Sequence, residues 1–297
     1  CIRDRAMGLP LNEARRSYRD RNHKPELLVA ITDFYALRGF RPLNEIADEL
    51  AAAPELAALR QGFEPTKASL FALYRRLMQC DQAEVNDLLS PLIDRYLAER
   101  QGHSFDPSDR RDWVIEADRR FSAPARRDRG LFSLLLLNLL VLHPGDAIFL
   151  PAGELHAYLR GAAIEVMANS NNVLRGGLTE KHIDVPALLA TLNVDPAPAQ
   201  VLRPVAAKHP GEPETYPTPA AEFLLERHSL RAGEQRRISG ERPSLRVGLV
   251  LDGQVTLEAP GHPPLGLTHG AAFAIPAACA ASFHAQQRSV VYTVRAP

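Results

Sequence analysis

Residues 145–156 read GDAIFLPAGELH, and residues 270–281 read GAAFAIPAACAA. Each stretch begins with Gly and reaches a Pro-Ala pair after five further residues. The first stretch then continues to Gly153 and His156, where the second has Ala278 and Ala281. A repeat of this kind predicts two related β-barrels, of which one keeps a special histidine and the other has lost it.

Strand-length apolar runs, separated by Gly, Pro and Asp turns, follow residue 130 and predict an all-β region. The segment LDGQVTLE predicts a hairpin around Asp252–Gly253, and the Pro-rich residues 196–219 predict a linker between two β units. Near the start of the chain, LLVAIT at 27–32 predicts a buried strand. The apolar runs after residue 130 lie at 131–142, 147–150, 162–168, 221–230, 245–251 and 289–294.

Between these β segments the pattern is helical. Apolar residues recur at helical spacing in 66–79 and in 82–100, where Pro91 is expected to kink the helix, and Ser108 is expected to cap a third helix in 106–121. The sequence therefore predicts a mainly β fold with an α insertion. We expect part of the first barrel at 1–42, a helical domain at 43–125, the remainder of that barrel at 126–200 and a degenerate C-terminal barrel at 201–297.

Composition argues against several kinds of partner. The 297 residues include 35 basic and 35 acidic side chains with scattered arginine pairs, a distribution that does not favour nucleic acid. The longest apolar run, 131–142, is shorter than the roughly 20 residues of a membrane helix, and no signal peptide is visible. Three widely spaced cysteines argue against a disulfide scaffold. We expect a cytoplasmic monomer without nucleic-acid or membrane partners.

Two successive predicted strands carry polar side chains on one face. In a strand over 154–160, His156, Tyr158 and Arg160 point to the same side, and in the next strand Glu165 and Met167 share a face. Such faces line the cavity of a small barrel. Taken singly, His156 also fits a packed core histidine and Glu165 an exposed strand residue. Together they offer imidazole and carboxylate, the usual ligands of zinc.

Two polar segments flank these strands in sequence. In DRNHKPELLVAIT (20–32), Pro25 favours an extended conformation at Lys24, so that Lys24 and Glu26 project to one side, as suits a metal ligand beside an anion-binding or proton-handling group. In ANSNNVLRGGLTEKH (168–182), Arg175 and Lys181 could bind a phosphate. A surface turn and a flexible loop are the respective alternatives, and His23 is expected to be structural.

The spacing from Gly145 through Pro151 and Gly153 to His156 resembles the second conserved motif of the cupin barrels, in which the histidine is a metal ligand. Three longer stretches, with the helical block between the first and the second, resemble the class I (zinc-dependent) mannose-6-phosphate isomerases over essentially the whole chain. These stretches are NHKPELLVAITDFYALRGF, LPAGELHAYLRG and IEVMANSNNVLRGGLTEKHIDVP.

The resemblance implies two cupin-like, jelly-roll β-barrels plus an all-helical domain, and one zinc ion per site. It implies reversible isomerisation of mannose 6-phosphate and fructose 6-phosphate through an enediol(ate). The residues that it assigns are Glu26 and His156 as metal ligands, Arg175, Lys24 and Glu165 as catalytic groups, and Tyr158 and Lys181 as substrate-binding groups.

Two departures from the family pattern limit what is carried over. The family usually has Ser-Asp-Asn where this chain has Ser170-Asn171-Asn172, which removes a carboxylate. Its other two zinc ligands lie in a Gln-x-His segment upstream of HKPE, and none occurs between Cys1 and Glu26. A zinc site with two of four ligands should be weak. We therefore expect an incomplete first barrel and little or no activity from this chain by itself.

Two other functions fit the same residues. One is a cupin sugar-binding or regulatory protein that has lost catalysis, which the missing ligands and Asn171 would allow. The other is a different sugar isomerase on the same scaffold.

Overall fold

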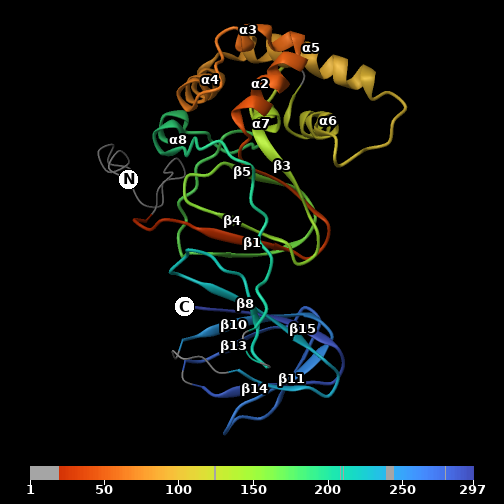
Figure 1. Ribbon diagram of the computed structural model, residues 1–297, viewed down its shortest axis with the longest axis vertical. Coiled ribbons are helices and arrows are strands. Elements are labelled where there is room, and N and C mark those ends of the chain that lie inside the picture. The colour runs from red at the N-terminus through yellow and green to blue at the C-terminus, as the bar shows by residue number, and fades with distance from the viewer. Residues whose placement is uncertain (1–19, 124, 208, 210, 239–243, 278) are drawn as a thin grey trace.

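The computed structural model describes residues 20–297 apart from 124, 208, 210, 239–243 and 278, and it stacks helices and β-sheets along one long axis (Figure 1). The helices lie at one end, and two pairs of sheets follow below them (Figure 1). We call strands β1–β6 the first unit and strands β7–β15 the second unit.

The first unit consists of two three-stranded sheets, ordered β4-β1-β6 and β3-β2-β5. All pairings within them are antiparallel. The strands are β1 (Glu26–Ala30), β2 (Phe34–Phe40), β3 (Leu137–Leu142), β4 (Ala147–Leu150), β5 (His156–Arg160) and β6 (Ala163–Met167).

The second unit consists of a five-stranded sheet, β13-β10-β15-β8-β7, and a four-stranded sheet, β12-β11-β14-β9. The chain reaches it through residues 196–219, which are tied to both units by the isolated bridges Ala147↔Leu202 and Val205↔Thr215. Its strands are β7 (Glu214–Thr215), β8 (Leu224–Leu230), β9 (Gln235–Ile238), β10 (Arg246–Asp252), β11 (Gln254–Glu258), β12 (Leu265–Thr268), β13 (Ala272–Ile275), β14 (Ala281–Ala285) and β15 (Ser289–Arg295).

The two units share one topology, as the sequence repeat predicts. The order β4-β1-β6 matches β13-β10-β15, and β3-β2-β5 matches β12-β11-β14. The repeat begins with the same hydrogen bond in each unit: the Gly145 N–H donates to the Ala30 carbonyl and the Gly270 N–H to the Val250 carbonyl, both at 2.8 Å. Ala278, the counterpart of Gly153, lies outside the described residues. Each unit is a pair of facing sheets, and no closed barrel forms among the described strands.

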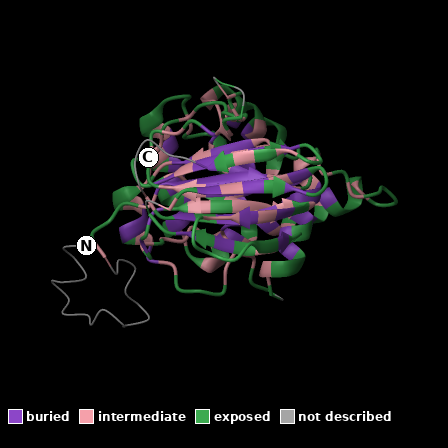
Figure 2. Cartoon of the chain, turned by 90° about the horizontal axis from the view of Figure 1, so that it is seen from below, coloured by how far each residue is buried: buried purple, intermediate pink, exposed green. Residues whose placement is uncertain are grey.

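Strand β1 is buried on both faces, which explains its continuous apolar sequence. Leu28 and Ala30 face the space between the two sheets of the first unit. Leu27 and Val29 face the other way and pack against second-unit residues such as Tyr292. Buried and exposed residues alternate along the strands that face the viewer in Figure 2. The buried strand predicted at 27–32 is confirmed over 27–30, and Ile31 and Thr32 lie beyond its end.

A helical insertion separates β2 from β3 and packs on the outer face of sheet β3-β2-β5 through residues such as Leu37 and Phe40. α8 (Val185–Thr191) follows the first unit and joins the same core through Leu188. The inserted helices are α2 (Leu43–Ala52), η1 (Pro54–Leu56), α3 (Ala57–Arg60), α4 (Lys67–Gln79), α5 (Gln82–Glu99), α6 (Arg110–Phe121) and α7 (Leu131–Leu136).

Two local predictions in this region are wrong. The apolar run 131–142 is not one strand, because residues 131–136 form helix α7 inside the helical core and only 137–142 form β3. A run that is buried on all sides has the same sequence signature as a helix and as a strand. Helix α6 is capped by Asp109, whose side chain accepts a hydrogen bond from the Arg111 N–H, and not by Ser108. None of the described helices is long and apolar enough to cross a membrane.

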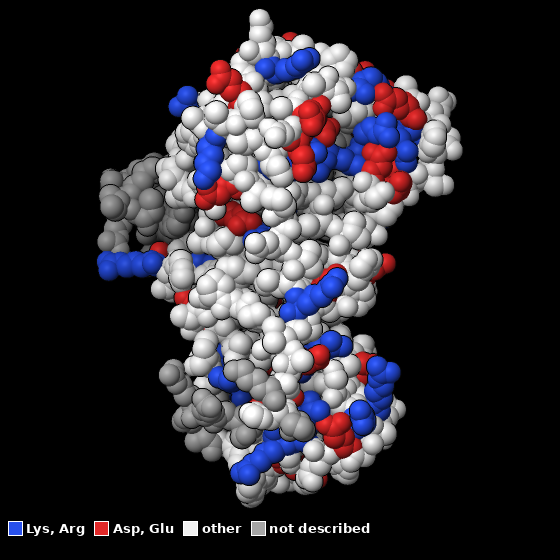
Figure 3. Space-filling view, in the orientation of Figure 1, with Lys and Arg blue, Asp and Glu red and all other residues white. Residues whose placement is uncertain are grey.

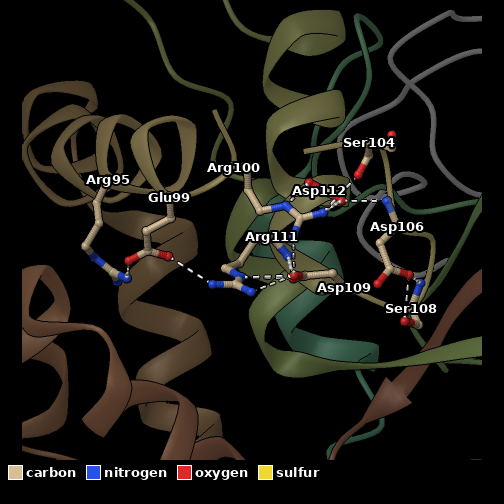
Figure 4. Close-up of polar contacts among 9 residues, drawn as sticks. All are labelled: Arg95, Glu99, Arg100, Ser104, Asp106, Ser108, Asp109, Arg111 and Asp112. Carbon is tan, nitrogen blue, oxygen red and sulfur yellow. Dashed lines mark hydrogen bonds and ion pairs between the residues drawn. The ribbon is translucent and has the colours of Figure 1, made fainter. Parts of the chain in front are cut away.

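Basic and acidic side chains are interspersed over the helical end of the molecule (Figure 3). Several of them fasten the loop between α5 and α6 (Figure 4). The Arg100 guanidinium donates to both carboxylate oxygens of Asp112, at 2.8 and 2.6 Å, and the same carboxylate accepts the Asp106 N–H at 2.7 Å. These contacts fix the start of α6, where Trp113 lies 5.4 Å from Tyr35 of β2, centroid to centroid.

The predicted hairpin at Asp252–Gly253 is also wrong, because β10 and β11 belong to different sheets of the second unit. Gly253, with φ of +82°, turns the chain from one sheet into the other. A Gly turn between two apolar segments looks the same in sequence whether the strands pair or diverge.

We expect Gly253→Ala to destabilise the protein more than Gly261→Ala. Both glycines have a left-handed backbone, which costs a non-glycine residue about 1–2 kcal/mol. A Cβ at 253 would in addition lie 2.3 Å from Ser289 Oγ, whereas a Cβ at 261 has no neighbour within 4 Å. This overpacking adds about 1–3 kcal/mol. Urea denaturation of both variants measures the difference, and equal losses would contradict the close contact.

Candidate functional site

A cavity of about 630 Å³ opens in the first unit between strands β1, β5 and β6 and the loop after β6. Its wall combines several segments that are distant in the sequence, among them 22–26, 150–159 and 172–178, with residues of helices α6, α7 and α8. Those predicted to act in the site and found on this wall are Lys24, Glu26, His156, Tyr158, Glu165 and Arg175. The fold therefore brings together all the predicted site residues except Lys181.

The two predicted metal ligands face each other across the sheets. Glu26 begins β1 and is 6% exposed, and His156 begins β5. His156 Nε2 lies 3.6 Å from Glu26 Oε2. Two donor atoms that each bind one zinc ion at about 2.1 Å with tetrahedral geometry are about 3.4 Å apart. The pair is thus spaced to share one metal ion.

Hydrogen bonds orient both side chains for binding a metal ion. His156 Nδ1 lies 3.0 Å from the backbone carbonyl of Glu154, and donation to this oxygen leaves the Nε2 lone pair free to face Glu26. Lys24 Nζ donates to Glu26 Oε1 at 2.7 Å, and both side chains are largely buried. This contact confirms that Lys24 and Glu26 project to the same side, and it leaves the second carboxylate oxygen turned to the histidine.

Tyr158 and Glu165 form a second pair on the wall. The Tyr158 hydroxyl donates to Glu165 Oε1 at 2.6 Å. Burial and then this hydrogen bond raise the pKa of Tyr158 above its ordinary range, so the phenol stays protonated around neutral pH. The Tyr158 ring lies 5.7 Å from the His156 ring, centroid to centroid. The two pairs are therefore neighbours in one site.

Strand β5 separates the site from the helical core. Ala157 and Leu159 pack against that core, whereas His156 and Tyr158 lie on the opposite face of the strand, and the cavity touches both faces. The prediction that Arg160 shares their face is wrong: its guanidinium lies 4.3 Å from the ring centroid of Phe105, beside the helices. The register between β2 and β5 shifts just before this residue, and such a bulge reverses the face of the residues that follow it.

Asp20 is a site residue that sequence reasoning missed. Its carboxylate accepts hydrogen bonds from Ser170 Oγ, the Asn171 N–H and Asn172 Nδ2, each at 2.9 Å. The Asn171 N–H makes the largest contribution to holding the pKa of Asp20 below its usual value. These bonds join the segment before β1 to the loop that leads to Arg175. No sequence signal links the two segments, because they meet only in the folded chain.

Other polar residues around the site lie as follows. Arg38 Nε donates to Glu154 Oε1 at 2.7 Å and so fixes the turn before His156. His23, expected to be structural, lines the cavity and pairs with Glu222 near β8. Lys181 lies apart, on a neighbouring hollow of about 580 Å³ whose lining includes several cations. The basic side chains there are Arg126, Arg127, Arg129, Lys181 and His182.

Among the described residues, no group of three or more His, Cys, Asp or Glu side chains could together hold a metal ion. Glu26 and His156 thus fit a metal by their donor atoms, spacing and tautomer, and they amount to two of the four ligands that zinc takes.

We expect Asp20→Ala to loosen the loop beside the cavity. The substitution removes the carboxylate that Ser170, Asn171 and Asn172 bond, and leaves weaker ties such as those to the Asn22 carbonyl. Amide hydrogen exchange over residues 168–178 should become about tenfold faster. Asp33→Ala, which removes an exposed aspartate paired with His143, serves as the matched control and should leave this segment unchanged. Equal exchange in both variants would show that Asp20 does not hold the loop.

Comparisons with known proteins show which family the sequence and the fold resemble. Residues 4–43 match the family model described as phosphomannose isomerase type I, catalytic domain. Mannose-6-phosphate isomerase of Escherichia coli K12 is 36% identical over 259 residues, which are 86% of this chain and 62% of the relative. The chain thus spans less than two thirds of the length of this relative.

Solved structures extend the likeness to the whole chain. A mutant of phosphomannose isomerase from Salmonella typhimurium superposes with a TM-score of 0.82 at 32% identity, covering 99% of this chain and 71% of the other. Mannose 6-phosphate isomerase from the same organism, bound to substrate and to a zinc atom, superposes with a TM-score of 0.77 at 31% identity, over 99% of this chain and 72% of the other. Since the fold, the site and these matches agree, the chain belongs to the type I phosphomannose isomerase family, with a mainly β, cupin-like fold and a helical insertion.

Proposed function

We propose that this chain carries the catalytic centre of a mannose-6-phosphate isomerase, an aldose–ketose isomerase that interconverts mannose 6-phosphate and fructose 6-phosphate through an enediol(ate). The observation that carries the proposal is the Glu26–His156 pair, 3.6 Å apart on the wall of a cavity that also holds Lys24, Glu165 and Arg175. The names of the relatives, and the neighbour bound to substrate and zinc, support it.

Glu26 and His156 are the residues that would hold zinc. When bound, zinc polarises substrate oxygens as a Lewis acid. Lys24 keeps the Glu26 carboxylate in place through its 2.7 Å contact, and the Glu154 carbonyl keeps the His156 ring oriented.

The reaction moves a proton between C1 and C2 of the sugar. Glu165 and Lys24 are the groups on the wall that can accept or donate that proton. The Tyr158 hydroxyl, protonated around neutral pH, fixes one oxygen of Glu165 and so orients the carboxylate. Arg175 supplies positive charge for the phosphate or for the enediolate. Lys181 lies on the neighbouring hollow, and we assign it a role in attracting the phosphate.

We also propose the domain division 1–42, 43–125, 126–200 and 201–297, with the first and third segments forming the catalytic unit. The start of α2 at Leu43 and the second-unit pairing of β7 with β8 support it.

The protein would act in the cytoplasm as a monomer on a small sugar phosphate, without nucleic-acid or membrane partners.

We expect weak, zinc-dependent isomerisation of mannose 6-phosphate by the purified chain, because two ligands hold zinc loosely. Fructose 6-phosphate formation, measured by a coupled assay after chelation and zinc addition, should fall at least about 100-fold in Glu165→Gln, the loss expected for a proton-transfer group. In His156→Ala, addition of zinc should no longer raise the rate of fructose 6-phosphate formation. Free mannose should not react, because it lacks the phosphate that the positive charge of Arg175 and Lys181 would attract.

The matched control is His143→Ala, which removes an exposed histidine outside the cavity and should keep parental turnover. Turnover that survives both His156→Ala and Glu26→Gln would contradict the assigned site. Binding of mannose 6-phosphate without zinc-restored turnover would instead support the alternative, a non-catalytic sugar-binding protein. That alternative is favoured by one observation, namely the two-ligand metal pair in the described chain.

A further inference from the structure

The interior of the second unit holds a cluster of charged and polar side chains where an apolar core is the rule. Glu226 and His228 lie on β8, Arg246 on β10 and Thr293 on β15. Each is 6% exposed or less. Burying such groups costs free energy unless they are paired, so their arrangement calls for a physical reason.

These side chains form a hydrogen-bonded and ion-paired network around Glu226. Its carboxylate accepts the Thr293 hydroxyl at 2.9 Å and Arg295 Nε at 2.9 Å, and Arg246 Nε lies 3.6 Å away. His228 Nε2 lies 3.0 Å from Thr293 Oγ1, whose hydrogen is already donated to Glu226, so Nε2 is the donor. The lone pair on His228 Nδ1 then has no hydrogen-bond partner in the described chain.

Strand register shows which residues of the two units correspond. Glu26 is paired with Leu150 in the first unit, and Arg246 with Ile275 in the second, where Leu150 and Ile275 occupy the same position of the sequence repeat. Arg246 therefore stands at the position of Glu26.

The same comparison places the other site positions. Leu28 is paired with Glu165, and its counterpart Gly248 with Thr293, so Thr293 stands at the position of Glu165. Ala281, at the start of β14, stands at the position of His156 at the start of β5. The second unit thus has a guanidinium and a methyl group where the first has the two candidate metal ligands.

We infer that this cluster is a former metal site, in which the Arg246 guanidinium supplies positive charge where a bound cation would supply it. Glu226 and His228 are ligand-type donors on one face of β8 and point into the same interior. Positions 246 and 281 no longer offer ligands, and Arg246 instead adds to the compensation of the buried Glu226 carboxylate that Arg295 provides by direct donation. Burial lowers the pKa of His228 to about 3, so its imidazole stays neutral and adds no second charge.

The inference predicts that two substitutions rebuild the site. In Arg246→Glu/Ala281→His, side chains at 246 and 281 would join Glu226 and His228 as four ligands in a tetrahedral set. We would make them in a His156→Ala background, which removes the candidate metal pair of the first unit. Failure of the proposed catalytic site then does not affect the outcome.

The probe is Co²⁺ alone. We expect one Co²⁺ per chain, the visible absorption of tetrahedral Co²⁺, and an increase in Tm of about 5 °C at saturating metal. The matched control adds His228→Ala to the same variant and should lose all three signals. A variant that unfolds without metal and refolds with Co²⁺ also supports the inference. Absence of binding, failure to refold with Co²⁺, or equal binding after His228→Ala would overturn it.

A second measurement tests the charge replacement without building a site. Arg246→Met leaves the buried Glu226 carboxylate with less compensation, and Glu226→Leu removes that carboxylate. We expect Arg246→Met/Glu226→Leu to have a higher Tm than Arg246→Met. Additive losses in this double-mutant cycle would contradict the proposed role of Arg246.

Discussion

The burial of β1 on both faces is the constraint on which the rest of the molecule depends. Its five residues alternate between the interior of the first unit and the contact with the second unit. The first of them is Glu26, so the strand that holds the two units together also fixes one candidate metal ligand at its end. Because a one-residue slip would turn every side chain of the strand to the opposite face, the register of β1 with β4 and β6 sets the direction of the Glu26 carboxylate.

The packing of the helical insertion sets the orientation of β5 in a similar way. In the second unit a short turn joins β11 to β12, whereas in the first unit the helices occupy the corresponding connection between β2 and β3. Their core packs against Ala157 and Leu159, and the opposite face of β5 carries His156 and Tyr158. One face of β5 thus contributes to the apolar core, and the other carries candidate site residues.

The sequence predicted the features that repeat or are periodic. The Gly-to-His spacing located the pair of units, the HKPE segment located β1, and apolar spacing located α4 and α5. The sequence-based predictions were wrong where contacts between residues distant in the sequence determine the local structure. Whether residues 251–258 form a hairpin depends on which sheet each strand joins, and the side to which Arg160 turns depends on a bulge. Asp20 has no recognisable motif, since the loop residues that it holds are 150 to 152 residues away.

Strands β5 and β6, which carry the site, stand at the ends of their sheets in the described chain, whereas β14 and β15 are covered by β9 and β8. An edge strand presents unpaired N–H and C=O groups that a further strand can bind. Any segment that pairs there would order His156, Glu165 and their neighbours at the same time. Affinity for such a strand and affinity for metal are then thermodynamically linked, so each must strengthen the other by the same factor.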